Sequence, residues 1–453
     1  MITAFPLRRD KWSAVRLRLE NLRRTPSGRL VQGTSWVVIG AGVNRGFTLV
    51  ANILSSRAIG AAEFGALGLT QTTVALFAVL AGGGLAAAAT KFIPEYTHSD
   101  HDRVLRVVTF TMISTCAIAA LTALCVYGSA GWFASDLLQR PTLTPLLRLA
   151  SPLLFTSVLS TSLNSCLDGF EAFKAGAIVN ILQGILIVPL AAGLTATHGS
   201  SGLLLALLVT STISIAAFGW YVMRNLGALT YSKPVMRILL ASGSERGMWA
   251  IFSLPALLSG IVGSSTLWFA AGLLARQARG LQELGIFNAA NQWRTMILFV
   301  PMTTARVCLP LLSGSHSERD SGAFKEVATL SLRLNVIFAV LCALPVCVAS
   351  PVLMKTFGSG FENGSPTLWL LAASAVIQVA ASNYGQVIAS TNRMWLGFLF
   401  NVMWAVLIFV PFLFPQWPRT SFGLALAIVM SYAIHTATEA GAIKMLALGE
   451  YRQ

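Results

Sequence analysis

The sequence predicts an all-α integral membrane protein of about twelve transmembrane helices, arranged as two parallel six-helix repeats around a central cavity. The first observation is composition: of 453 residues, 55% are hydrophobic and 11% are charged, which leaves too little polar surface for a water-soluble protein of this length. The second is that runs of about 20 apolar residues, enough to cross the hydrocarbon core as a helix, recur along the chain. The third is an internal repeat.

The apolar runs follow one another from Ser35 onwards. The predicted spans are Ser35–Ser56, Gly65–Ala88, Val107–Gly128, Thr144–Leu167, Phe173–Thr195, Gly202–Met223, Met248–Leu274, Gly285–Arg306, Ala328–Ser350, Thr367–Ala389, Trp395–Phe414 and Phe422–Ile443. They divide the chain into a basic N-terminal segment (1–30), an N-terminal lobe (31–223), a linker (224–247), a C-terminal lobe (248–443) and a tail (444–453).

The N-terminal segment is rich in arginine and lacks the apolar region and cleavage site of a secretory signal. Trp12, Val15, Leu19 and Leu22 repeat at helical spacing. The segment is therefore either a helix lying on an anionic membrane surface or an unstructured basic tail. In both cases we expect it to stay in the cytoplasm.

The basic residues predict the orientation of the spans. With a cytoplasmic N terminus, most of the 32 lysines and arginines fall on cytoplasmic connections. Those that fall outside are Arg57, Arg140, Arg148, Arg276, Arg279, Lys355 and Arg419. By the positive-inside rule, both termini are cytoplasmic. The net charge of +15 is then mainly an orientation signal beside acidic lipid, which argues against nucleic-acid binding.

The repeat appears when the chain is compared with itself at a nearly constant shift. The shift superposes Gly176 on Gly397, Asn180 on Asn401, Gly202 on Gly423, Glu63 on Glu283 and Gly65 on Gly285. A unit of six spans starts and ends on the same side of the membrane, so the two copies run parallel and are related by an axis along the membrane normal. Such a pair of bundles encloses a central cleft.

Arg45 lies at the middle of the first span, too deep to reach either surface easily. A charged residue there costs about 2.5–3.5 kcal/mol on insertion scales. On a helical wheel it shares a face with Thr48, Asn52 and Ser56. We expect this face to line a wet, protein-walled space.

Arg294 is a second cation inside a span, the eighth, beside a polar stripe that holds Asn291. Of the 17 acidic residues, Glu439 alone falls within a predicted span, so the middle of the protein is net cationic. This predicts an anionic cargo, and a guanidinium suits a phosphate or diphosphate. The alternative is that each arginine bonds neighbouring helices as a structural link. Under the first reading Arg45, Arg294, Asn52 and Asn291 form a diphosphate-binding site.

Each of the other polar residues has two possible interpretations. Lys91 and Arg306 either guide a phosphate to the cytoplasmic entrance or anchor the span ends by the positive-inside rule. His435 and Glu439, one turn apart in the twelfth span, are either a proton-coupling pair or an interfacial hydrogen-bonded pair. The six cysteines have no CxxC spacing and no histidine cluster beside them, which predicts neither a metal site nor a disulfide framework. No cofactor is expected.

The stretch RLVQGTSWVVIGAGVNRGFTLVANILSSRAIGAAEFGALGL, followed by KFIPEY, resembles the N-terminal signature of bacterial polysaccharide flippases, with a weaker echo in QELGIFNA at residues 282–289. These flippases belong to the multidrug/oligosaccharidyl-lipid/polysaccharide exporter (MOP) superfamily. The resemblance implies a MATE-like, V-shaped fold of two six-helix lobes in the bacterial inner membrane. It identifies the fold better than the cargo. Peptidoglycan-precursor flippases of the same superfamily usually carry two further spans, which are not seen in this sequence.

The resemblance also implies a function, namely moving an undecaprenyl-diphosphate-linked oligosaccharide, such as an O-antigen or exopolysaccharide repeat unit, across the membrane by alternating access. Polysaccharide polymerase and export machinery would be its partners. Two alternatives remain. A cation-coupled drug antiporter shares the superfamily fold but calls for buried carboxylates. A membrane-embedded glycan polymerase or ligase calls for a large catalytic loop outside the membrane.

Overall fold

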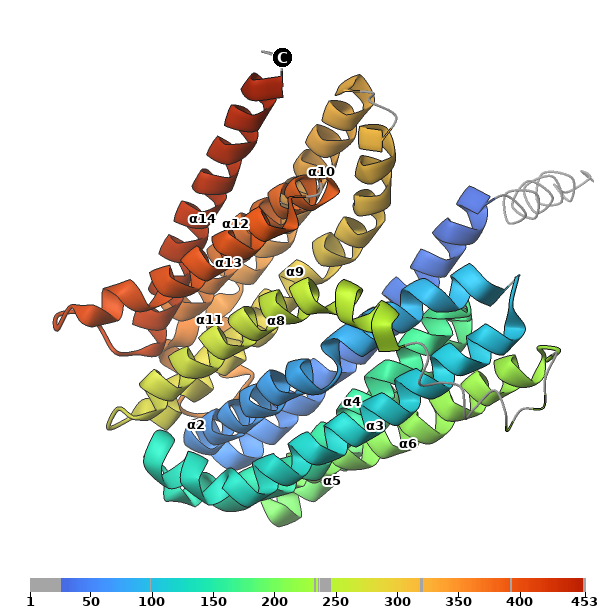
Figure 1. Ribbon diagram of the computed structural model, residues 1–453. Helices are drawn as coiled ribbons and strands as arrows, with labels where there is room; N and C mark the ends of the chain where they lie inside the picture. Colours follow the sequence, from blue (N-terminus) through green and yellow to red (C-terminus); the bar gives the residue numbers. More distant parts are fainter. Residues whose placement is uncertain are drawn as a thin grey trace, which may run out of the picture.

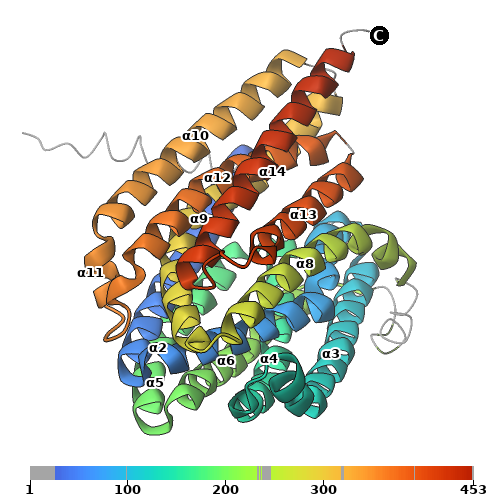
Figure 2. The same ribbon diagram turned by 90° about the vertical axis from the view of Figure 1, so that its left-hand side faces the viewer.

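The computed structural model describes residues 26–97, 99–231, 234, 236, 246–317, 321–391 and 393–450. In this part of the chain the structure consists of helices joined by short turns, without a strand (Figures 1 and 2). The predicted N-terminal segment and the linker fall mostly outside the described residues. The last helix runs to Glu450, past residue 444, where the sequence predicted a tail.

The helices of the N-terminal lobe are α2 (Pro26–Thr97), α3 (His101–Trp132), α4 (Thr144–Gly169), α5 (Phe173–His198) and α6 (Ser200–Gly227). Those of the C-terminal lobe are α8 (Arg246–Ala275), α9 (Gly280–Ser317), α10 (Ser321–Val348), α11 (Ser350–Lys355), α12 (Ser365–Ser390), α13 (Met394–Phe409) and α14 (Ser421–Glu450). Four short segments complete the connections: η1 (Phe133–Leu137), η2 (Pro141–Leu143), η4 (Glu362–Gly364) and η5 (Val410–Leu413).

Helix α2 contains two antiparallel legs that reverse at Gly60, and these are the first two predicted spans. Gly60 has φ 80° and ψ 173°, a backbone conformation open almost only to glycine. The chain turns there with almost no loop. We call the segment before Gly60 the first leg of α2 and the segment after it the second leg.

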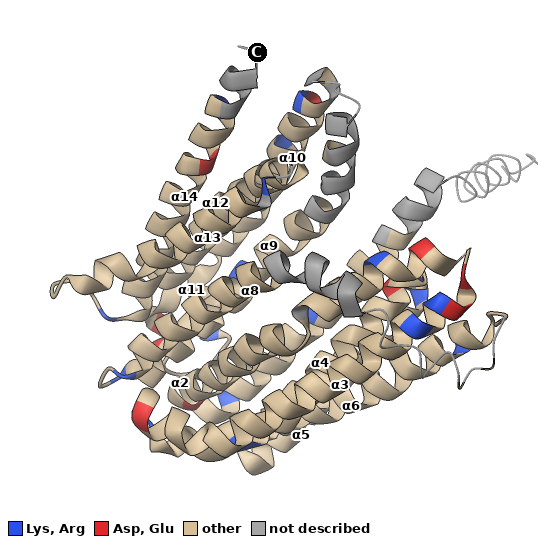
Figure 3. Cartoon of the chain, in the orientation of Figure 1, with Lys and Arg blue, Asp and Glu red and all other residues tan. Residues whose placement is uncertain are grey.

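Ten helical segments of the described chain are long and apolar enough to cross a membrane. One of them, Ser35–Gly82, covers both legs of α2. Helix α9 contains the eighth predicted span, and the side chains of its second half lie partly outside the described residues. Most charged residues lie near the helix ends, and long stretches between them carry none (Figure 3).

The two lobes diverge towards the end of the bundle where the C terminus lies, which we call the terminal end (Figures 1 and 2). Within the N-terminal lobe α2 packs on α4 and α5, and within the C-terminal lobe α9 packs on α12 and α10. Between the lobes, α2 packs against both α8 and α9. The opposite end, marked by Gly60, Arg140, Gln277 and Gly358, is called the far end.

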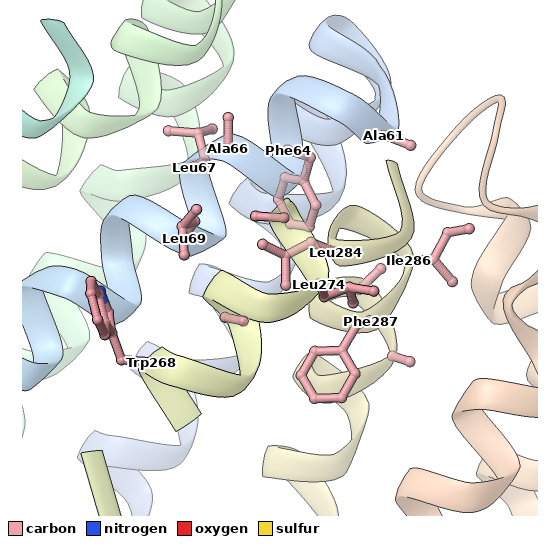
Figure 4. Packing of buried hydrophobic residues seen from close by; sticks show 14 of the residues in the cluster. Ala61, Phe64, Ala66, Leu67, Leu69, Trp268, Leu274, Leu284, Ile286 and Phe287 are labelled. Carbon is pink, nitrogen blue, oxygen red and sulfur yellow. The ribbon is translucent and has the colours of Figure 1, made fainter. Parts of the chain in front are cut away.

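At the far end the second leg of α2 crosses the start of α9, which corresponds to it in the second repeat, and the two backbones are in contact. A Cβ atom added to Gly65 would overlap the carbonyl oxygen of Leu281, and one added to Gly285 would overlap that of Ala61. The shift that superposes Gly65 on Gly285 also superposes Ala61 on Leu281. The two contacts are therefore equivalent, related by a pseudo-two-fold axis between the repeats. We call residues or contacts that are related in this way mates. Apolar side chains of α2, α8 and α9 interleave around this crossing, with Phe64 beside Leu284 (Figure 4).

Side chains also bond backbone carbonyls across the lobes at the far end. Arg276 donates to the carbonyl of Leu137, and Ser56 Oγ donates to Phe357 O at 2.9 Å. These bonds are again mates, because the same shift superposes Ser56 on Arg276 and Leu137 on Phe357. Arg140 adds bonds from Nε to Ala275 O (3.0 Å) and from Nη2 to Gln277 O (2.6 Å). The structure is thus closed at the far end.

Candidate functional site

A pocket of about 170 Å³ lies between the lobes on the pseudo-two-fold axis. It is lined by Phe64, Gly68, Gln71, Thr72 and Ala75 of the second leg of α2 and by Asn288, Asn291 and Gln292 of α9. The shift superposes Gly68 on Asn288, Gln71 on Asn291 and Thr72 on Gln292. Mates therefore face each other across the pocket, and each lobe supplies one wall. We call it the axial pocket.

Gly68 allows the helices to approach at the axial pocket. A Cβ atom at this position would overlap the Asn288 amide, so the amide of one repeat occupies the space left by its mate in the other. Asn288 Nδ2 is buried and has no hydrogen-bond partner in the described part of the chain. This nitrogen packs against Gly68 and is closed to solvent, so it does not face the space inside the pocket.

Arg294 lies just behind the axial pocket, inside the C-terminal lobe, and is 8% exposed. Its Nε donates to Ser374 Oγ (2.9 Å), its Nη2 to Gln378 Oε1 (2.5 Å) and its Nη1 to Asn291 Oδ1 (3.3 Å). Its guanidinium carbon lies 5.7 Å from the centre of the Tyr432 ring. These partners are all neutral. Asn291 both accepts a hydrogen bond from Arg294 and lines the pocket. It therefore connects the buried guanidinium to the pocket wall.

Arg45 is exposed on the first leg of α2 and faces the other lobe. Its Nη1 donates to Thr295 O at 3.3 Å, and its guanidinium lies 5.2 Å from the centre of the Phe299 ring. Thr295 is about one turn beyond Asn291 and Gln292 on α9. The helix face predicted from the sequence is the one that meets the C-terminal lobe, because Gly42 also abuts Phe299 and Ser56 bonds Phe357.

The other predicted residues lie apart from the axial pocket. Asn52 is 5% exposed and lies two turns from Arg45 towards the far end. Lys91 is exposed on the second leg of α2 towards the terminal end, with its ammonium 5.1 Å from the Phe92 ring. Arg306 lies on α9, and its side chain is outside the described residues.

His435 and Glu439 meet inside the C-terminal lobe. His435 Nδ1 lies 3.6 Å from Glu439 Oε2, and the residues are 5% and 3% exposed. Neither imidazole nitrogen nor Glu439 Oε2 has a hydrogen-bond partner in the part of the chain that is described. The Tyr432 ring, 6.5 Å from that of His435, stands between this pair and Arg294. The His435–Glu439 pair and Arg294 are thus neighbours, separated by one aromatic ring.

The lobes meet along two seams, one where α2 packs on α8 and one where α2 packs on α9. The two seams differ at a pair of tryptophans. On the α2–α8 seam, Trp268 Nε1 donates to Thr73 Oγ1 at 2.8 Å. The repeat shift makes Trp293 and Thr48 the corresponding pair on the α2–α9 seam. There Thr48 Oγ1 bonds Asn44 Oδ1 instead, and Trp293 Nε1 is buried without a partner in the described chain. The α2–α9 seam, which carries Arg45, therefore lacks the bond that ties the other seam.

Sequence reasoning did not single out Gln71 and Thr72 or the two tryptophans. The repeat held the signal: shifting the polar stripe of α9 back by one unit gives Gln71 and Thr72. No group of three or more His, Cys, Asp or Glu in the described residues is placed to hold a metal ion. The site instead combines cationic and amide side chains, which suits an anionic, hydroxyl-bearing molecule.

Comparison with known proteins adds sequence relatives. Residues 30–316 match the protein family described as "Polysaccharide biosynthesis protein". The chain is 25% identical over 294 residues to the "Lipid III flippase" of Escherichia coli (strain K12), which covers 64% of this chain and 69% of the relative. The Lipid III flippase of Shigella flexneri matches to the same extent.

Solved structures of the MOP superfamily share the fold. A multidrug resistance MATE family transporter in an inward-facing conformation has a TM-score of 0.71 at 12% identity, over 91% of this chain and 99% of that chain. A MOP superfamily transporter from Pyrococcus furiosus, described as having reversed polarity in its binding pocket, has a TM-score of 0.65 at 14% identity, over 95% and 98%. The chain therefore has the MATE-like fold of this superfamily, as the sequence predicted.

Proposed function

Because the chain belongs to the polysaccharide biosynthesis protein family, whose pattern it matches over residues 30–316, we propose that it is a flippase. Its cargo is an undecaprenyl-diphosphate-linked oligosaccharide, the repeat unit of an O-antigen or exopolysaccharide. It carries this cargo from the cytoplasmic to the periplasmic leaflet of the bacterial inner membrane. Both termini are cytoplasmic in this proposal, so the terminal end faces the cytoplasm.

The observation that carries the proposal is the position of Arg45. A guanidinium at mid-span depth faces the opposite lobe, bonds a carbonyl and rests on an aromatic ring, beside a seam without the tryptophan bond of its mate. The sequence of the first leg of α2 and of α9 from Leu284 to Ser317 contains no acidic residue. A diphosphate would supply the countercharge at this position. Arg294, through Asn291, supports the same anion from the other lobe.

The cycle follows from the two ends of the bundle. With the far end closed, the head group enters from the terminal end while the lipid tail stays in the membrane along the α2–α9 seam. Lys91 and Arg306 attract the phosphates at the entrance. Rocking of the lobes then opens the far end and releases the head group outside. Arg45 lowers the free-energy cost of removing the phosphates from water at mid-membrane depth. Weak binding suffices for this, because tight binding would trap the cargo.

We further propose that His435 and Glu439 take part in coupling. The pair is buried beside Tyr432, which contacts Arg294, so a proton that binds there changes the electrostatic field at the anion site. Polysaccharide polymerase and export machinery would receive the product on the outer side.

The two alternatives make different demands on the site. A carrier of cationic drugs needs an acidic group at the cleft, whereas the axial pocket is lined by amides and its charged neighbour is Arg294. A polymerase or ligase needs catalytic groups outside the membrane, whereas the connections at the far end that the structure describes are short turns. Both observations favour transport of an anion.

The experiment is complementation of a host whose own lipid-linked oligosaccharide flippase is deleted. Expression should restore surface polysaccharide and clear lipid-linked repeat units from the inner leaflet. Arg45→Ala should abolish export at normal membrane levels, and Arg45→Lys should retain part of it. Arg148→Ala, an arginine whose ring contact with Tyr127 stays within one lobe, is the matched control. Full export by Arg45→Ala would remove the basis of the proposal.

A further inference from the structure

The chemistry of the axial pocket is distinct from that of the anion site. Its polar lining consists of the amides of Gln71, Asn288, Asn291 and Gln292 and the hydroxyl of Thr72, and none of its lining residues is charged. An amide both donates and accepts hydrogen bonds, which is what neighbouring hydroxyl groups on a sugar ring require. A diphosphate would leave water there without a cationic lining group, which is unfavourable.

Several of these polar groups are unused in the protein. Gln71 and Gln292 are half-buried and form no side-chain hydrogen bond with another residue in the described chain. Asn291 Oδ1 already accepts from Arg294, and Thr72 Oγ1 donates to Leu69 O. The free amides come from both lobes, so an occupant would be held from two sides.

The size of the pocket limits the occupant. At about 170 Å³ it is smaller than the 300–1,000 Å³ typical of sites for drug-sized ligands, and it corresponds to one sugar ring. Arg45 bonds Thr295, about one turn along α9 from the lining residue Gln292. A head group whose phosphates lie at Arg45 would therefore place its first sugar in the axial pocket.

We infer that the axial pocket is a subsite for one uncharged sugar residue, the one next to the diphosphate of the cargo. This inference rests on the proposed function and adds to it the class of sugar that is selected. Because each lobe supplies one wall, the subsite exists only while the lobes meet at the axis. Opening of the far end separates the walls, removes the hydrogen bonds that one wall supplies and releases the sugar.

The test measures binding to the purified full-length protein in lipid nanodiscs. The first probe is a C20 polyprenyl diphosphate that carries one N-acetylglucosamine, and the second is the same diphosphate without a sugar. A third carries glucuronic acid, which is charged. Wild type should bind the first probe about tenfold more tightly than the second, as two added hydrogen bonds would give. The third should gain little over the second.

Gln292→Met and Gln71→Met remove one amide from each wall at nearly constant side-chain length. Each should weaken binding of the N-acetylglucosamine probe about threefold, the share of one of the two hydrogen bonds, and leave the sugar-free probe unchanged. Gln183→Met is the matched control, because Gln183 accepts from Asn44 within the N-terminal lobe, at 3.4 Å, and lies outside the pocket. It should change neither affinity.

The outcomes separate the two proposals. Equal affinity of wild type for the first two probes overturns the sugar subsite and leaves the flippase proposal standing. So does a variant that weakens both probes equally. If wild type binds neither lipid diphosphate, the proposed function fails and the subsite fails with it. The comparison of probes on wild type decides the matter even if a variant does not fold.

Discussion

Replacing Arg140 by alanine should shift the equilibrium between the closed and open far end. The side chain donates to Ala275 O at 3.0 Å and to Gln277 O at 2.6 Å, and both bonds cross from one lobe to the other. A hydrogen bond from a charged donor contributes about 1.5–3 kcal/mol, and less where water has access. Arg140 is half-buried, so the two bonds together stabilise the closed form by about 2 kcal/mol.

This free energy sets the size of the expected shift. A change of about 2 kcal/mol alters the equilibrium about 30-fold, so a far end that is open in about 1% of wild-type molecules would be open in roughly a quarter of Arg140→Ala molecules. In the proposed cycle the lobes separate at the far end, so the two bonds would be absent from the open form. The variant should therefore fold normally and differ in conformation.

The assay is electron–electron double resonance in nanodiscs on a cysteine-free background. Spin labels at Ser135 and Lys355 suit it, since both positions are exposed at the far end and are mates under the repeat shift, one in each lobe. Arg140→Ala should add a longer distance that wild type barely populates. Arg148→Ala, which removes an arginine from the same end but no bond between the lobes, should not. An unchanged distribution in Arg140→Ala would refute the reasoning.

Three further perturbations test other parts of the structure. Gly285→Val adds atoms where a backbone carbonyl of α2 already lies, so the same spin labels should report a far end that no longer closes, and export should fall at least tenfold. Glu439→Gln should make export insensitive to a proton uncoupler, and export that still collapses with the uncoupler would exclude the coupling role. Trp268→Phe breaks a buried hydrogen bond worth about 1 kcal/mol and should lower the melting temperature, whereas Trp293→Phe, at the unpartnered mate, should not.

The fold was predictable from the sequence because apolar length and the repeat both encode it. Twelve runs of apolar residues and a constant shift predicted two parallel lobes, and the reciprocal contacts of Gly65 and Gly285 follow the same shift. The acidic residue of the repeated motif has a structural role: Glu283 accepts from the backbone N–H and hydroxyl of Ser421 at 2.7 Å each, which caps α14.

The site could be predicted from the sequence only in part. A helical wheel gives the face of Arg45, but it does not say whether Arg294 points to a cleft or back into its own lobe, since that depends on Ser374 and Gln378 of α12, which are distant in the chain. The axial pocket depends on two walls from different repeats. The repeat in the sequence pairs the residues of the two walls, but that these walls meet and enclose a pocket follows only from the structure.

The turn at Gly60 has a mechanical consequence. Because one glycine joins the two legs of α2 without a loop, the hairpin contributes to both seams. The first leg contacts α9 through Arg45, and the second contacts α8 through Thr73 and α9 through Gly65. A movement of the hairpin therefore changes the packing at both seams at once. In the proposed cycle, the seam along which the lipid tail lies and the seam about which the lobes rotate would therefore belong to the same helical hairpin.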